Sequence, residues 1–558
     1  MKKLFLLLFL FLSVGSQAFA RTPLMPVEDL KAGMRGYAKT VISGDTIETF
    51  PVEVLGVTGS DSMGYQILIR AGGDVIARSG GIAQGMSGSP VYIDGRLAGA
   101  IAYGKAFTDP HYCLLTPIHD MLDILDKPEP HRDVSPSLLP KGTPLLAGGF
   151  TPAGISLLEE GLEPFGMTVA DSGAPGTASS AKDLEPGSSV GAALIQGDLT
   201  LGALGTVTWT DEQGRILAFG HPFMSRGAAD FFLTKTWVLA SLPNLQAAYK
   251  IGNIGAAAGT FSQDRGAGVA GQIGRLPAYI PMYVSVSDTT RSQNGSARVK
   301  LVNDEQLAHK LAASVLVSQA AKTVDHGKGG SARIRFDITA RDEKGELLHI
   351  SRDNMYFDKE SVVKPLPAEL QETVQVLLQN KLERVRITNI DVDVDASTEA
   401  LIAEIKKVSV KEKEPKPGDT IHLQVTLKPY REKEFVRTIA YKMPKDASGE
   451  VQLNVRGGAS MAWIRELLRK QKDGEEEQAK KEEKKKDVKL SDYVREVNQA
   501  DRNNDIIIEF APDHKRKAVR EEEEEESLAS LLKGGRNKQS VAIDYIVDGE
   551  QKVTVRLP

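Results

Sequence analysis

Residues 80–100 read GGIAQGMSGSPVYIDGRLAGA, and this stretch decides how the N-terminal part of the chain folds. Gly85 allows a sharp backbone turn, so that its N–H and the N–H of Ser87 can both point at one developing oxyanion. Asp94-Gly95 between two apolar runs predicts a β-hairpin over residues 91–103. Ser87 is therefore the candidate nucleophile, with the amides of Gly85 and Ser87 as its oxyanion hole. A tight turn without catalytic function is the alternative.

A second stretch, residues 205–221, reads GTVTWTDEQGRILAFGH and predicts a strand, a turn and a strand that ends at His221. The two stretches together resemble the SpoIVB peptidases, serine endopeptidases with a chymotrypsin-like double β-barrel. The resemblance covers roughly residues 30–290 and implies that Ser87 is the nucleophile and His221 the base that takes its proton. The histidine comes first in that family, so the two barrel halves are exchanged here. Catalytic triads are defined by geometry and not by chain order.

The third member of a triad is less clearly marked. Asp264 follows His221 within the same half, so it could accept the second imidazole N–H, although an ion pair with Arg265 is the competing interpretation. Asp74 lies shortly before the nucleophile, near the place where the acid of the resembled family stands. Asp230 is a third choice. The sequence favours Asp264.

The first residues have the pattern of a secretory signal peptide, with a positive start, an apolar stretch over residues 4–14 and Ala18-Phe19-Ala20 as the cleavage pattern. We expect the signal peptide to span residues 1–20 and the mature protein to be periplasmic or secreted. No later apolar run reaches the roughly 20 residues of a membrane span, so no integral span is expected after cleavage.

A protein or peptide substrate, with no cofactor, is what the family resemblance implies, and composition and spacing argue against two other kinds of partner. The 69 Lys and Arg residues nearly balance the 74 Asp and Glu residues, which argues against nucleic acid as a partner. The spacing of His111, His119 and His131 matches no zinc pattern. Residues 391–402 begin like a calcium loop but lack its glycine and its final carboxylate. No metal is expected.

The chain is predicted to be mainly β, and its sequence pattern divides it into several segments. The expected peptidase domain spans residues 21–345, with a serine half (21–132), a connector (133–190) and a histidine half (191–345). A helical connector (346–382), an immunoglobulin-like β-sandwich (383–460) with period-two strands, a charged helical spacer (461–490) and a C-terminal α+β segment with an acidic run (491–558) follow.

These observations predict an exported serine endopeptidase that acts through an acyl-enzyme. The resemblance implies that it cleaves one or a few protein partners, and the protein itself is a candidate among them. Two other classes stay open. One is an inactive scaffold or binding protein that keeps the peptidase fold, and the other is an acyl hydrolase acting on a non-protein ester.

Overall fold

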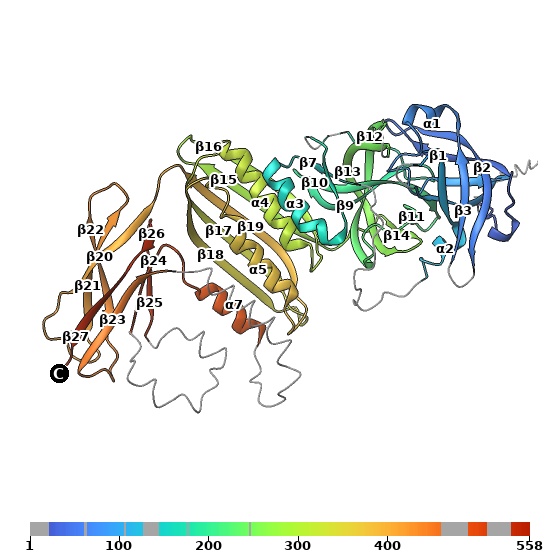
Figure 1. Ribbon diagram of the computed structural model, residues 1–558. Coiled ribbons are helices and arrows are strands. Elements are labelled where there is room, and N and C mark those ends of the chain that lie inside the picture. Colours follow the sequence, from blue (N-terminus) through green and yellow to red (C-terminus); the bar gives the residue numbers. More distant parts are fainter. Residues whose placement is uncertain are drawn as a thin grey trace, which may run out of the picture.

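The computed structural model describes residues 22–60, 64–104, 108–126, 144–173, 176, 178–244, 247–458, 489–510 and 537–558. Figure 1 shows three parts in a row: two β-barrels at one end, a sheet covered by helices in the middle, and a β-sandwich at the C-terminal end. No helix within these ranges is both long and apolar enough to cross a bilayer. The predicted signal peptide lies outside the described residues.

The first barrel contains the serine segment. Its six strands close in the order β1-β2-β3-β6-β5-β4. They are β1 (Arg35–Val41), β2 (Ile47–Ser60), β3 (Gly64–Ala71), β4 (Pro90–Ile93), β5 (Arg96–Tyr103) and β6 (Tyr112–Pro117). The predicted hairpin is β4–β5, and short helices α1 (Gly73–Ser79) and α2 (Ile118–Leu122) flank it. Alternate residues of β2, such as Phe50, Val52 and Val54, fill the barrel interior.

The second barrel contains the histidine segment. Its strands are β9 (Ser189–Gly197), β10 (Thr200–Thr210), β11 (Arg215–Ala218), β12 (Gly227–Leu242), β13 (Tyr249–Arg265) and β14 (Gly268–Ile273). They pair in the order β9-β12-β13-β14-β11-β10, and the pairing of β10 with β9 closes the ring. The predicted double β-barrel is therefore confirmed. Two short strands in the expected connector, β7 (Leu145–Gly148) and β8 (Val169–Asp171), extend the sheet beyond β10.

The middle part continues the same sheet from β9. Strands β15 (Tyr279–Asp288), β16 (Gln293–Val302), β17 (Gly330–Arg341), β18 (Leu347–Asp358) and β19 (Arg386–Ser397) are packed against helices α3 (Pro152–Leu162), α4 (Ala308–Val324) and α5 (Pro367–Gln379). The structure divides the chain differently from the expected boundaries, because β18 lies in the expected helical connector and β19 in the expected sandwich. The alternating side chains Ile390, Val392 and Val394 of β19 are buried in the core that also contains these helices.

The C-terminal part is the predicted β-sandwich, with two four-stranded sheets in the orders β22-β21-β20-β26 and β25-β24-β23-β27. The strands are β20 (Ile402–Val410), β21 (Thr420–Pro429), β22 (Phe435–Lys442), β23 (Glu450–Gly457), β24 (Asp505–Phe510), β25 (Gln539–Ala542), β26 (Ile546–Asp548) and β27 (Glu550–Arg556). The last four come from the segment expected to stand apart. They complete the sandwich because Leu453, Ile506 and Val555 share one core. Nearly all of the predicted charged spacer, and the acidic run, lie outside the described residues.

A buried ion pair fastens the C-terminal helix α7 (Leu490–Gln499) to the middle sheet. Arg352 of β18 and Glu369 of α5 are 1% and 0% exposed, and Nε lies 2.7 Å from Oε1. The Arg352 guanidinium also donates to the carbonyl oxygens of Val497 (3.1 Å) and Ala500 (2.8 Å). This pair therefore joins a strand and a helix of the middle part to the chain that enters the sandwich.

Replacement Arg352→Met is expected to lower the free energy of unfolding by about 3–5 kcal/mol, because it leaves the Glu369 carboxylate buried without its cation. Urea-induced unfolding measures the change. Arg333→Met is the matched control, because Arg333 pairs with Asp353 at 31% and 30% exposure, and we expect that loss to stay below about 1 kcal/mol. Equal shifts for the two variants would contradict the interpretation.

Candidate active site

The serine turn lies between α1 and β4, where the first barrel meets the second. The carbonyl oxygen of Ser87 accepts a hydrogen bond of 2.8 Å from the N–H of Thr206 in β10. A Cβ added to Gly88 would lie 2.0 Å from the carbonyl oxygen of Thr206 and 2.4 Å from the nitrogen of Phe219. Only glycine allows this approach, so Gly88, the residue after the candidate nucleophile, lets the two barrels come into contact.

The backbone of the turn holds two amide groups in fixed directions. The carbonyl of Gln84 accepts the backbone N–H of Lys250 at 2.9 Å, and the carbonyl of Met86 accepts the N–H of Ser89 at 2.9 Å. Because C=O and N–H point in opposite directions in a trans peptide, the N–H groups of Gly85 and Ser87 point away from these contacts. Neither N–H has a hydrogen-bond partner among the described residues. Two oriented donors are thus available to a ligand.

The histidine turn is attached to the first barrel. Phe219 and Gly220 both have left-handed backbone conformations, with φ of 68° and 67°. The Thr116 hydroxyl, from β6, donates to the Gly220 carbonyl at 2.5 Å. The His221 ring is 6% exposed, and its centroid lies 5.9 Å from that of Tyr103 at the end of β5. The structure therefore brings the Ser87 and His221 segments to the same interface.

The imidazole of His221 is suited to accept a proton. Its Nδ1 lies 2.7 Å from the Pro222 carbonyl oxygen, so Nδ1 carries the hydrogen and Nε2 has a free lone pair. Burial lowers the pKa of His221, although the bond to Pro222 acts in the opposite direction. No hydrogen bond joins the Ser87 hydroxyl to His221 in the described chain. Such bonds often tighten only when substrate is present.

Asp264 lies at the end of β13 and binds the loop that follows His221. The sequence predicts that it accepts a hydrogen bond from the imidazole, but it makes no such contact. Its fully buried carboxylate accepts backbone N–H groups of Phe223 (2.7 Å), Met224 (2.8 Å) and Arg226 (3.1 Å). Burial raises the pKa of Asp264, and these three donors oppose the rise. The Pro222 carbonyl occupies the place at Nδ1 that the sequence assigned to Asp264, because both Asp264 oxygens are engaged by amides.

The two alternative acids have other contacts. The side chain of Asp74 is 82% exposed and pairs with Arg78 one helical turn later. Asp230 accepts hydrogen bonds from the Thr260 hydroxyl (3.1 Å) and from the N–H of Ala278 (2.7 Å). These contacts give both carboxylates a structural role and place neither of them at His221.

The variant Asp264→Asn is expected to reduce the rate of Ser87 acylation about 10²-fold. Its amide group would place a donor against one of the three backbone donors and shift the loop that follows His221, and a displacement of about 1 Å has an effect of this size. A direct triad aspartate would lose about 10⁴, so the size of the loss distinguishes the two roles. Rapid-quench kinetics of fluorophosphonate labelling measures the rate, with exposed Asp74→Asn as the control. An unchanged rate would show that the loop does not need Asp264.

Lys250 is a site residue that the sequence did not reveal. It is 2% exposed, and burial lowers its pKa to about 7. Its Nζ donates to the hydroxyls of Thr40 (3.0 Å) and Thr206 (3.5 Å), and the Thr206 hydroxyl donates to the Gly85 carbonyl at 3.0 Å. A single lysine in a strand normally indicates an exposed position, so no local pattern marks it as buried.

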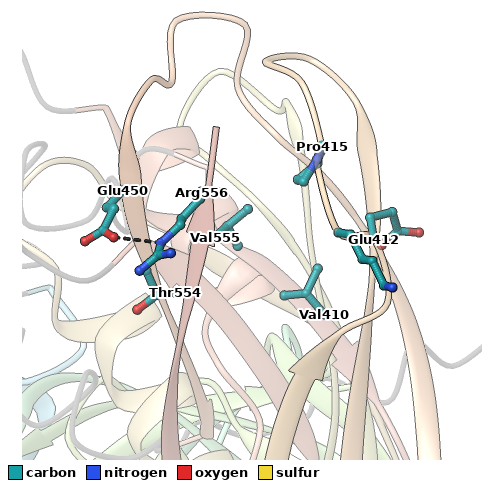
Figure 2. A pocket seen from close by; sticks show the side chains of 8 residues that line it. Val410, Glu412, Pro415, Glu450, Thr554, Val555 and Arg556 are labelled. Atoms are coloured by element: carbon teal, nitrogen blue, oxygen red, sulfur yellow. Dashed lines mark hydrogen bonds and ion pairs between the residues drawn. The ribbon is translucent and has the colours of Figure 1, made fainter. Parts of the chain in front are cut away.

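A separate cavity of about 380 Å³ opens in the C-terminal sandwich, at the opposite end of the molecule from the two barrels (Figures 1 and 2). It is lined by Val410, Glu412, Lys413, Pro415, Glu450, Thr554, Val555 and Arg556. Arg556 and Glu450 form an ion pair of 2.8 Å across one side, as Figure 2 shows. Its lining has no histidine or cysteine, and the described chain contains no group of three side chains that could hold a metal ion.

Comparison with known proteins supports the resemblance seen in the sequence. Residues 18–121 match the family model of the SpoIVB peptidase S55 family. This stretch contains the first barrel with Gly85 and Ser87, and it ends before the histidine segment. No curated protein and no solved structure matches the chain.

Proposed function

We propose that the protein is an exported serine endopeptidase that uses Ser87 and His221. One observation carries the proposal: the Gly85 and Ser87 amides are oriented, have no partner in the described chain, and lie on a turn that packs against the histidine segment. The similarity to the SpoIVB peptidases over residues 18–121 supports the same reaction class. The periplasm or the exterior is the proposed location, because the first residues have a signal-peptide pattern.

The proposed reaction begins when the Ser87 oxygen attacks the carbonyl carbon of a peptide bond while Nε2 of His221 takes the hydroxyl proton. The two amides stabilise the negative charge on the former carbonyl oxygen. The C–N bond then breaks, and His221 gives its proton to the leaving amine. Water repeats the sequence on the acyl-enzyme and releases the acid. The Pro222 carbonyl keeps the imidazole in the required tautomer throughout.

The proposed substrates are one or a few proteins of the same compartment, including the protein itself, as the family resemblance implies. An inactive scaffold would keep the turn for its fold alone. An acyl hydrolase would use the same groups on a non-protein ester.

Labelling of the mature chain with a fluorophosphonate, followed by peptide mapping, tests the proposal. An adduct on Ser87 supports a serine hydrolase, and absence of an adduct on the folded chain favours the scaffold. A peptide-library digest and a series of acyl esters then separate the two enzyme classes. Cleavage of esters without any peptide product would overturn the endopeptidase assignment.

A further inference from the structure

We propose that Lys250 is a positioning residue for the oxyanion turn, acting on Gly85 through the Thr206 hydroxyl. The inference rests on the proposed function, and it adds a residue from the second barrel to a site whose nucleophile lies in the first. Lys250 does not touch substrate, because it is 2% exposed.

The backbone and the side chain of Lys250 both contact the serine turn, and they do so from the same side. The Lys250 N–H donates to the Gln84 carbonyl at 2.9 Å, which fixes the peptide that carries the Gly85 N–H. The Lys250 side chain passes beneath the turn, with Cδ 3.0 Å from the position that a Cβ on Gly85 would take. A Cβ at position 85 would therefore be in unusually tight contact with Lys250, which shows that the turn packs directly on this lysine.

A chain of hydrogen bonds continues from Nζ to the turn. Nζ donates to the Thr206 hydroxyl (3.5 Å), which donates its own hydrogen to the Gly85 carbonyl (3.0 Å). The Thr206 N–H donates to the Ser87 carbonyl (2.8 Å). Thr206 therefore holds both residues of the oxyanion hole, and Lys250 orients its hydroxyl. Because hydrogen bonds from a charged donor are stronger, the protonated lysine holds the turn more firmly.

No described residue provides a counter-ion for Nζ. Strand β10 and the serine turn have no charged side chain, and Thr40 of β1 offers only a hydroxyl. The charged residues of the neighbouring strands are Arg35 and Lys39 in β1, Asp230 and Lys235 in β12, and Asp264 and Arg265 at the far end of β13, and none forms an ion pair with Lys250. Desolvation alone lowers the pKa of Lys250, to about 7.

These contacts predict a characteristic pH dependence. His221 must be neutral to act as a base, whereas Lys250 holds the turn best when it is charged. The rate of Ser87 labelling should therefore decline on the alkaline side with an apparent pKa of about 7, and this decline should vanish in Lys250→Met. A lysine that only filled space would change the rate without removing the alkaline limb.

The test measures the maximal inactivation rate of the full mature chain by a fluorophosphonate between pH 5 and 9. Lys250→Met and Thr206→Val should each reduce this rate about tenfold at pH 6, a smaller effect than the 10²–10³ lost with a direct oxyanion donor. The double variant should be no slower than the slower single variant, because both changes break one chain of bonds. If the double variant instead lost the product of the two single reductions in rate, the proposal would be overturned.

Thr236→Val is the matched control. Its hydroxyl is buried in the neighbouring strand β12 and has no partner in the described chain, so the same isosteric change should leave the rate and its pH profile unaltered. If Lys250→Met does not fold, as judged by near-UV circular dichroism, Thr206→Val decides the question. A Thr206→Val rate equal to wild type then overturns the proposal.

The outcomes separate the two levels of inference. A wild-type chain that is not labelled at Ser87 removes the proposed function and this role of Lys250 with it. A labelled wild type whose rate and profile are unchanged in Lys250→Met removes only the role of Lys250. Unfolding provides a readout independent of activity. The unfolded lysine titrates near about 10.4 and the folded one at about 7, so wild-type stability should rise with pH between these values relative to Lys250→Met.

Discussion

Ser87→Ala is expected to abolish labelling by fluorophosphonates and to reduce peptide hydrolysis by about 10⁵–10⁶, the loss seen when a catalytic serine is removed. The thermal midpoint should not change, because the Ser87 hydroxyl makes no hydrogen bond to the described residues and is not fully buried. Mass spectrometry of the labelled chain and a thermal melt measure the two effects. Together they separate loss of chemistry from loss of fold.

Ser89→Ala is the matched control for this experiment. Ser89 lies two residues further along the same turn, is 0% exposed, and its hydroxyl has no partner in the described chain. Its removal should leave labelling intact. If Ser87→Ala still takes up the label at wild-type rate, another residue is the nucleophile and the proposed mechanism fails.

Gly88→Ala should affect both stability and labelling, with a loss of about 3 kcal/mol or more in the free energy of unfolding and no measurable labelling. The new Cβ would lie 2.0 Å from the Thr206 carbonyl oxygen and 2.4 Å from the Phe219 nitrogen, and both neighbours are backbone atoms that cannot rotate away. The turn would have to withdraw from the second barrel, taking Ser87 away from His221. Thermal melts and labelling of the purified variant measure the result.

Gly95→Ala separates this collision from the cost of the backbone conformation. Gly95 has φ of 73° in the β4–β5 hairpin, and a Cβ there would meet nothing within 4 Å. A left-handed alanine costs about 1–2 kcal/mol, and labelling should persist. Equal destabilisation by the two substitutions would mean that the barrels do not approach each other at Gly88.

The parts of the site that could be predicted from sequence are those fixed by a few neighbouring residues. The glycines around Ser87 determine a turn, and Asp94-Gly95 determines a hairpin. The position and type of both elements can therefore be predicted from neighbouring residues alone. The strand, turn and strand that lead to His221 follow in the same way. Both segments also resemble one enzyme family, and this resemblance is the basis for predicting that Ser87 pairs with His221.

The supporting contacts could not be predicted, because they join residues far apart in the chain. Asp264 meets backbone amides about forty positions earlier, and no side-chain pattern encodes an acceptor of main-chain N–H groups. Lys250 is buried only because β13 crosses to the first barrel, and the glycine- and alanine-rich sequence of that strand lacks a period-two pattern. The sequence also did not show that β24–β27 belong to the sandwich, because a long segment separates them from β23 in the chain.

Strand β13 supports the serine turn at one end, through Lys250, and the histidine loop at the other, through Asp264. Both residues follow Ser87 in the chain, so under the proposed export they would leave a secretion channel after it. A partly translocated polypeptide would therefore expose its nucleophile without the backbone and ammonium donors that shape the turn. Under the proposed function, hydrolytic competence would then arise only once the second barrel has closed.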